Sequence, residues 1–113
     1  MKRRSLDPDM APESAEQSLC KALLSLDSVP AMRAFLRDLC TPAELEAMTD
    51  RWRVVPLILK GMPYRDIHEQ TAVSITTIGR VARCLNEGNG GYQKAVMAIR
   101  PRSRVNVKAG ASA

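Results

Sequence analysis

The segment from Ser74 to Thr77 contains side chains whose types and spacing suit the reading of duplex DNA. Ser74 is a good helix N-cap, so a helix is predicted to begin directly after it. In the first turn of that helix, Thr76 and Thr77 carry hydroxyl groups that can hydrogen-bond to base edges in the major groove. The neighbouring Ile75 can make an apolar contact with a thymine methyl group. The chemistry predicted here is therefore recognition of base edges.

Cationic side chains flank this predicted reading surface. Arg80 and Arg83 lie further along the same helix, where guanidinium groups can bind the phosphate backbone. Gly79 has no side chain, which allows the helix to approach DNA closely. The remaining candidate contacts precede the reading helix: Lys60, Arg65 and His68.

These residues are predicted to belong to a helix-turn-helix that spans about residues 63–85. The inward contacts of such a motif are supplied by Ile67, Val73 and Ile78. Ala72 occupies the turn position where a left-handed backbone favours glycine, a departure that costs about 1 kcal/mol. The alternative is a plain helical hairpin with a solvated charged side. Such a hairpin would not need this combination of apolar plugs, a capped second helix and cationic side chains.

The rest of the chain predicts an all-α protein. Pro56 lies inside one predicted helix, where we expect a kink and not a stop. That helix begins with a capping box from Thr41 to Glu44. The length of 113 residues allows one domain, predicted at residues 13–100 between tails at 1–12 and 101–113. The predicted helices cover residues 13–26, 28–40, 41–60, 63–71, 74–86 and 92–100.

Charge is distributed unevenly along the chain. Residues 1–50 contain six Lys and Arg against nine Asp and Glu, whereas residues 51–113 contain eleven against three. The C-terminal part is therefore predicted to face a polyanion. Aromatic residues make up only 4% of the chain, so its small core must be aliphatic. Sharing that core with a second copy of the chain would increase the apolar surface that folding buries.

Other classes of function find little support in the sequence. The three cysteines (Cys20, Cys40 and Cys84) are widely spaced and have one histidine to help them, so no metal site is expected. We find no catalytic triad, carboxylate pair or phosphate-binding loop, and we expect neither an enzyme nor a cofactor. The basic N-terminus leads into no apolar stretch, and no apolar run approaches the roughly 18 residues that span a membrane. We expect a cytoplasmic protein without a membrane partner.

Three segments together resemble the Trp-repressor superfamily. They are CTPAELEAM at residues 40–48, the Arg51-Trp52-Arg53 step and the helix-turn-helix itself. The run TIGRVARCLNEGNGGY at residues 77–92 is more specific and is similar to the YerC/YecD branch. The resemblance covers about residues 32–99. It implies an all-α, Trp-repressor-like multi-helix domain, an intertwined homodimer, and binding of a near-palindromic double-stranded operator through two helices.

The resemblance also raises the question of a small-molecule corepressor. In the parent family two arginines sandwich an indole ring, and Arg51 and Arg80 match those positions. Val81 stands where the repressor has a glycine that makes room for the ligand, and Cys84 replaces a serine that meets the ligand's amino group. Tryptophan is therefore not expected to bind, and whether another effector does is left open. The possible effector pocket comprises Thr41, Arg51, Thr77, Arg80, Val81 and Cys84.

The function predicted from the sequence is that of a sequence-specific DNA-binding transcription regulator acting as a repressor. The alternative is a helical protein-interaction module whose helix-turn-helix is vestigial. Salt-dependent binding to duplex DNA would separate the two, because phosphate contacts make affinity depend steeply on salt.

Overall fold

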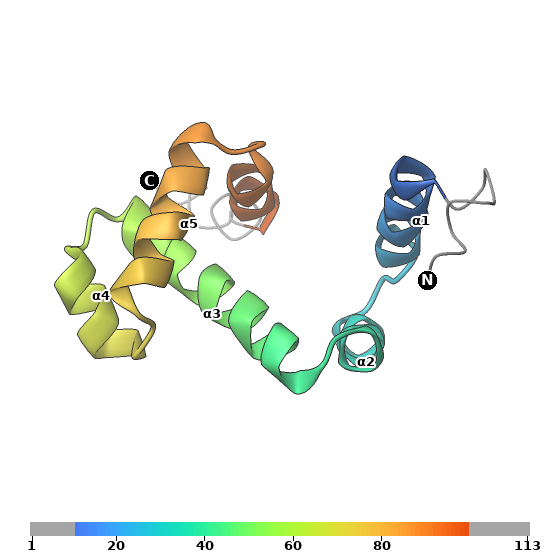
Figure 1. Cartoon of the computed structure of the whole chain (residues 1–113), viewed down its shortest axis with the longest axis horizontal. Helices are drawn as coiled ribbons and strands as arrows, with labels where there is room; N and C mark the ends of the chain where they lie inside the picture. Colours follow the sequence, from blue (N-terminus) through green and yellow to red (C-terminus); the bar gives the residue numbers. More distant parts are fainter. Residues whose placement is uncertain (1–10, 100–113) are drawn as a thin grey trace, which may run out of the picture. The chain divides into compact units, whose positions relative to one another are not determined.

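The structure is a computed structural model that describes residues 11–99, and within them it contains helices and no strand (Figure 1). The predicted tails fall outside the described residues, apart from Ala11 and Pro12. The chain divides into two compact units after Leu45, in the first turn of α3, and each unit is described by itself. The helices are α1 (Pro12–Leu24), α2 (Val29–Leu39), α3 (Pro42–Leu59), α4 (Tyr64–Thr71), α5 (Ile75–Glu87) and a further helix at residues 91–99.

Side-chain caps start three of these helices, and the caps at Thr41 and Ser74 are as predicted. The hydroxyl of Ser28 accepts a hydrogen bond of 3.2 Å from the amide of Ala31 at the start of α2. At the start of α3, Thr41 and Glu44 form the capping box, with N–H···O distances of 2.8 and 3.1 Å. Ser74 caps α5 in the same way as Ser28 caps α2.

The boundaries of α1 differ from the prediction by one or two residues. The helix begins at Pro12, because proline is well suited to the first turn, where its missing N–H needs no partner. It ends at Leu24 and not at Leu26. The hydroxyl of Ser25 donates to the carbonyl of Ala22 at 2.8 Å, and its amide bonds to the same turn, so the chain closes there.

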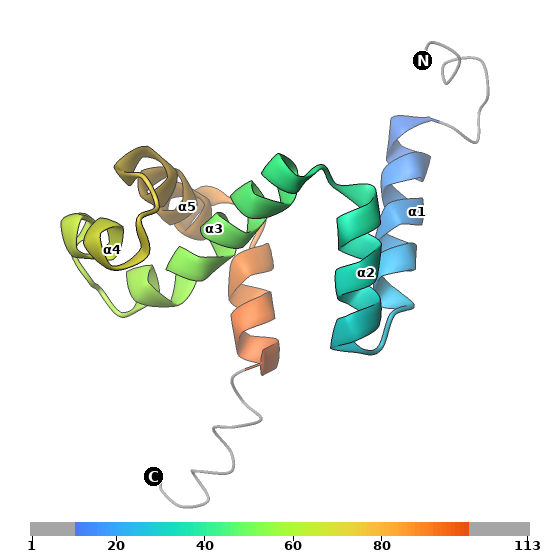
Figure 2. The same ribbon diagram turned by 90° about the horizontal axis from the view of Figure 1, so that it is seen from below.

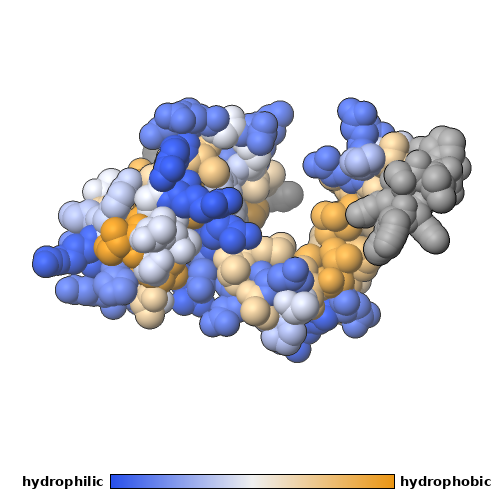
Figure 3. Space-filling view, viewed as in Figure 1, coloured by the Kyte–Doolittle hydropathy of each residue, from blue (hydrophilic) through white to orange (hydrophobic). Residues whose placement is uncertain are grey.

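The first unit has little interior of its own. None of the described residues in α1 or α2 is buried. Apolar side chains gather over these two helices in the space-filling view (Figure 3). Leu24 is 84% exposed and Val29 is 79% exposed, far more than is usual for large aliphatic residues in a finished core. Within its described residues, this unit therefore has an amphipathic surface whose apolar side chains stay exposed.

The second unit contains the hydrophobic core. Its centre is formed by Val54 and Val55 of α3, against which Ile67, Val73 and Ile78 pack. The burial of these three residues is as predicted. Other members of the cluster are Val81 and Leu85, with Leu57, Ile58, Met62, Tyr92 and Val96 packed against it.

Helix α3 continues through Pro56, as the sequence predicted, and the amide of Lys60 still bonds to the carbonyl of Pro56 at 3.1 Å. Apolar side chains that recur at helical spacing along α3 mark its buried side only in part. Val55 is fully buried, but Trp52 and Leu59 stay 39% and 48% exposed. Val54, next to Val55, is also fully buried.

The helix at residues 91–99 is attached to the end of α5 (Figure 2). Gly88 makes the turn, since a Cβ there would overlap the carbonyl oxygen of Cys84. The side-chain amide of Gln93 donates to the carbonyl of Leu85 at 3.0 Å. The Tyr92 ring stacks on Trp52, with centroids 6.5 Å apart. These contacts fix the C-terminal end of α5 to α3.

Candidate nucleic-acid interface

A tight turn joins α4 to α5 at the place where the sequence predicts a helix-turn-helix. The two helices lie against each other in Figure 1 and Figure 2 and are joined by residues 72–74. Ala72 adopts the left-handed conformation, with φ 67° and ψ 8°, as its place in the motif predicted. Its amide bonds to the carbonyl of His68 at 2.7 Å and closes α4.

Side-chain hydrogen bonds reinforce this turn. The hydroxyl of Thr71 donates to the carbonyl of Ile67 at 2.7 Å and accepts from the amide of Val73 at 3.1 Å. Nδ1 of His68 lies 2.8 Å from the carbonyl oxygen of Val73. Because a carbonyl only accepts, Nδ1 carries the hydrogen and Nε2 is the nitrogen left for another group. His68 therefore ties α4 to the turn, a role that the sequence did not predict.

Helix α5 has a buried side and an exposed side. The buried side carries Ile78, Val81, Ala82 and Leu85, at the spacing of a helix packed on a core. Thr76, Arg80 and Arg83 are exposed, and Ile75 is 46% exposed. The space-filling view shows polar side chains covering this helix (Figure 3). These four side chains, all predicted to meet bases or phosphates, thus lie on the surface that the core leaves open.

Thr77 differs from its neighbour Thr76 in environment. It is half-buried, its amide donates to the hydroxyl of Ser74 at 3.1 Å, and its hydroxyl accepts from the same group at 3.0 Å. Ser74 and Thr77 therefore hold each other at the start of α5. Of the two threonines, Thr76 is the one whose side chain is exposed.

Gly79 offers open space along α5. A Cβ at this position would meet none of the described atoms within 4 Å, so neither packing nor backbone conformation requires a glycine. Ile75 and Arg83, four residues before and after it, are exposed on the same side. The glycine therefore leaves a gap between two exposed side chains, where another molecule can approach the backbone.

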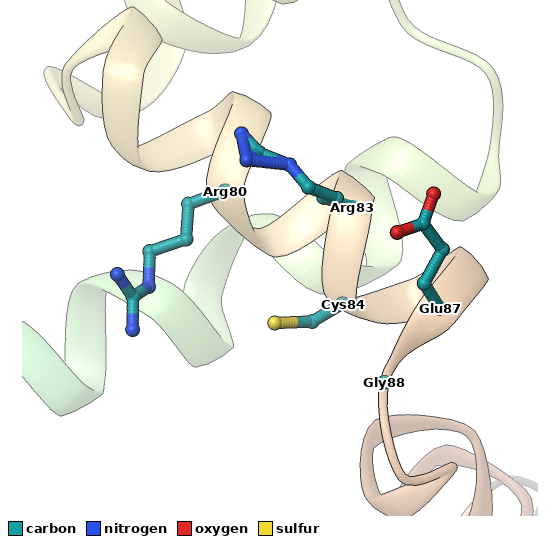
Figure 4. Close-up of a pocket in the computed structure, with 5 residues that line it drawn as sticks. All are labelled: Arg80, Arg83, Cys84, Glu87 and Gly88. Atoms are coloured by element: carbon teal, nitrogen blue, oxygen red, sulfur yellow. The ribbon is translucent and has the colours of Figure 1, made fainter.

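An open pocket of about 270 Å³ lies at the C-terminal end of α5. The side chains of Arg80 and Arg83 extend from α5 in different directions, and the Sγ atom of Cys84 points to the same side as Arg80 (Figure 4). Glu87 and Gly88 complete the lining. Glu87 follows Arg83 by one helical turn, and that spacing could have identified it from the sequence. The two guanidinium groups make this a cationic surface with one acidic edge.

The residues of the predicted effector pocket are found in different surroundings. Arg80 and Cys84 line the open pocket, but its lining among the described residues does not include Val81. Val81 is fully buried in the core of the second unit. Arg51 is half-buried on α3, and Thr41 belongs to the first unit, where its hydroxyl and amide are both used in the capping box.

The remaining candidates lie at the edges of the motif. Lys60 follows α3 and Arg65 lies in the first turn of α4, both exposed. One residue near the turn was not predicted to be part of the interface. Arg53 of α3 reaches the carbonyl of Thr71, with a distance of 3.4 Å from its terminal nitrogen. The two residues are 18 positions apart, and no local pattern could have paired them.

The model of the family described as Trp repressor protein matches residues 15–99. The chain belongs to the Trp repressor family. The uncharacterized protein YerC of Bacillus subtilis (strain 168) is 37% identical over 78 residues, which cover 69% of this chain and 75% of that protein. The Trp operon repressor homolog of Xylella fastidiosa (strain M23) is 33% identical over 81 residues, or 71% of this chain and 88% of that protein.

A solved structure gives the same family. The crystal structure of a TrpR-like protein from Eubacterium eligens ATCC 27750 is similar, with a TM-score of 0.71 and 33% sequence identity. The match covers 82% of this chain and 95% of that one. The predicted membership of the Trp-repressor superfamily and its YerC-like branch is confirmed, as is the all-α Trp-repressor-like fold.

The Trp repressor family is a family of transcription regulators, and membership of it points to DNA binding. Among residues 11–99, none of the helices is both long and apolar enough to cross a membrane.

Proposed function

We propose that the protein is a cytoplasmic transcriptional repressor that binds a near-palindromic duplex site as a homodimer, with α5 of each subunit in the major groove. The observation that carries this proposal is the exposed side of α5. Thr76, Arg80 and Arg83 project from a helix whose opposite side is locked into the core. A rigid helix with exposed hydroxyl and guanidinium groups suits base and phosphate contacts together.

Selection from a pool of randomised duplexes tests the proposal without a known operator. We expect a two-fold symmetric consensus whose half-sites are centred about one helical turn apart, or a multiple of that distance. Arg80→Ala and Thr76→Ala should weaken binding to the selected duplex and leave the circular-dichroism spectrum unchanged. Lys94→Ala, which removes an exposed charge outside the motif, is the matched control. Binding that shows no salt dependence would instead favour a protein-interaction module.

The homodimer is supported by the apolar surface of the first unit. None of the described residues in α1 or α2 is buried, although both helices carry large aliphatic side chains. A second copy of the chain can cover that surface and so give the first unit the buried core that it lacks in a single copy. Sedimentation should show a dimer as the folded species. A folded monomer at micromolar concentration would contradict this part of the proposal.

Regulation by tryptophan is not part of the proposal. The side chain of Val81 is fully buried among Val54, Val55 and the other core residues. A ligand at this position would have to displace a packed valine, and overpacking of this kind costs about 1–3 kcal/mol. We therefore expect the protein to bind DNA without added tryptophan.

A further inference from the structure

Arg53 is an exposed cation next to the helix-turn-helix but outside its two helices. It lies on α3 directly before Val54 and Val55, both of which are fully buried. Its backbone is therefore held firmly by the core of the second unit. Its side chain runs towards the turn, where a terminal nitrogen lies 3.4 Å from the carbonyl oxygen of Thr71.

This contact directs the guanidinium group to a defined place. Thr71 is the last residue of α4, and its carbonyl lies at the negative end of the helix dipole. The hydrogen bond from Arg53 is long and therefore weak, so its main effect is to orient the side chain. Four and five residues further on, Ile75 and Thr76 begin the exposed side of α5. Arg53 is thus oriented towards the part of the turn that leads into the predicted reading helix.

Most of the hydrogen-bonding capacity of Arg53 is unused. A guanidinium group has five N–H donors, and the Thr71 carbonyl takes one of them. Within residues 11–99, no carboxylate partner is recorded for this side chain. An exposed, oriented guanidinium with several donors left over is suited to a bidentate contact with a phosphate.

We propose that Arg53 is a DNA-binding residue that contacts a backbone phosphate at the edge of the major groove, oriented by the Thr71 carbonyl. This inference rests on the proposed function, since it requires that α5 enters the groove. It adds a contact from α3 to those of α4 and α5. Phosphate contacts fix the register of a protein on duplex DNA, so Arg53 helps to set how deeply the turn approaches the backbone.

The test measures how affinity for one generic duplex depends on salt, between about 0.05 and 0.2 M. Arg53→Gln removes the charge. Each lost phosphate contact should reduce the slope of log affinity against log salt by about 0.9, or roughly twice that for a dimer. Arg53→Lys keeps a charge that can bind phosphate and should retain most of the slope. Lys94→Gln removes one exposed charge from residues 91–99 and should leave the slope unchanged.

The outcomes separate this inference from its alternatives. A lower slope in Arg53→Gln alone, with an unchanged melting temperature, supports the phosphate contact. An unchanged slope, or an equal fall in Lys94→Gln, overturns it, because the side chain would then act only on the turn or through overall charge. Wild-type protein without any salt-dependent binding to the duplex would instead overturn the proposed function, and this inference with it.

Discussion

Replacing Gly79 by alanine should separate the stability of α5 from its fit to DNA. Gly79 lies in the interior of the helix, and an added Cβ would meet none of the described atoms within 4 Å. Glycine in a helix interior is less favourable than alanine by about 1 kcal/mol. We therefore expect Gly79→Ala to raise the free energy of unfolding by about that amount. For a small domain this corresponds to an increase in Tm of about 4–8 °C, measurable by circular dichroism at a fixed protein concentration.

DNA affinity should change in the opposite direction. The new methyl group would fill the gap between Ile75 and Arg83, both exposed on the same side of the helix. If the backbone approaches DNA at this gap, the methyl group overpacks the contact by about 1–3 kcal/mol. That cost is a loss of roughly fivefold to hundredfold in affinity. Fluorescence anisotropy with the duplex selected by the wild-type protein measures it.

Gly91→Ala provides the matched control. Gly91 begins the helix at residues 91–99, and an added Cβ would again meet none of the described atoms within 4 Å. This variant should gain some stability and keep its DNA affinity. A Gly79→Ala protein that is more stable and binds the selected duplex as tightly as wild type would refute the reasoning, because Gly79 would then not be a point of close approach.

Four further experiments, on variants at three positions and on tryptophan binding, test the turn, the end of α5 and the effector. Ala72→Gly should raise Tm slightly, because relief of the left-handed strain (about 1 kcal/mol) exceeds the entropic cost of glycine. Gly88→Ala should lower the free energy of unfolding in a denaturant titration by about 1–3 kcal/mol, since its Cβ would overlap the Cys84 carbonyl. His68→Ala should lower the free energy of unfolding by about 1 kcal/mol and weaken DNA binding. His68→Asn, which keeps a hydrogen-bond donor, should recover part of both losses. Calorimetric titration with tryptophan should give no heat, and one micromolar site per subunit would show that the buried Val81 does not prevent binding.

Helices α4 and α5 and the turn between them were predictable because each of their signals is local. Ser74 caps an amide three residues further on, and the spacing of Ile67, Val73 and Ile78 indicates the buried side. The left-handed turn at Ala72 followed from its position relative to those residues. Where cap, spacing and turn agree within a short segment, little tertiary context is needed to define the structure.

The contacts that depend on tertiary packing could not be predicted. Arg53 meets Thr71 only because α3 packs beside the turn, and His68 reaches Val73 only because the turn bends back on α4. On α3 the apolar residues occupy more than one side, and the sequence does not say which side the core uses. Trp52 lies at helical spacing from Val55 and stays partly exposed, whereas Val54 and Val55 are both fully buried. Periodicity identifies a helix more reliably than it identifies the neighbour of each face.

The position of Val81 bears on how the orientation of α5 is set. Its side chain is fully buried in the same cluster as Val54 and Val55 of α3. Burial of one such valine contributes about 1.5–3 kcal/mol, and that contribution is present whenever the second unit is folded. A small molecule that oriented α5 by entering this position would have to replace the contribution before adding any of its own. We therefore expect folding alone to fix the orientation of α5 and with it the positions of Thr76, Arg80 and Arg83. Regulation would then act on the amount of protein or on the exposed side of α5.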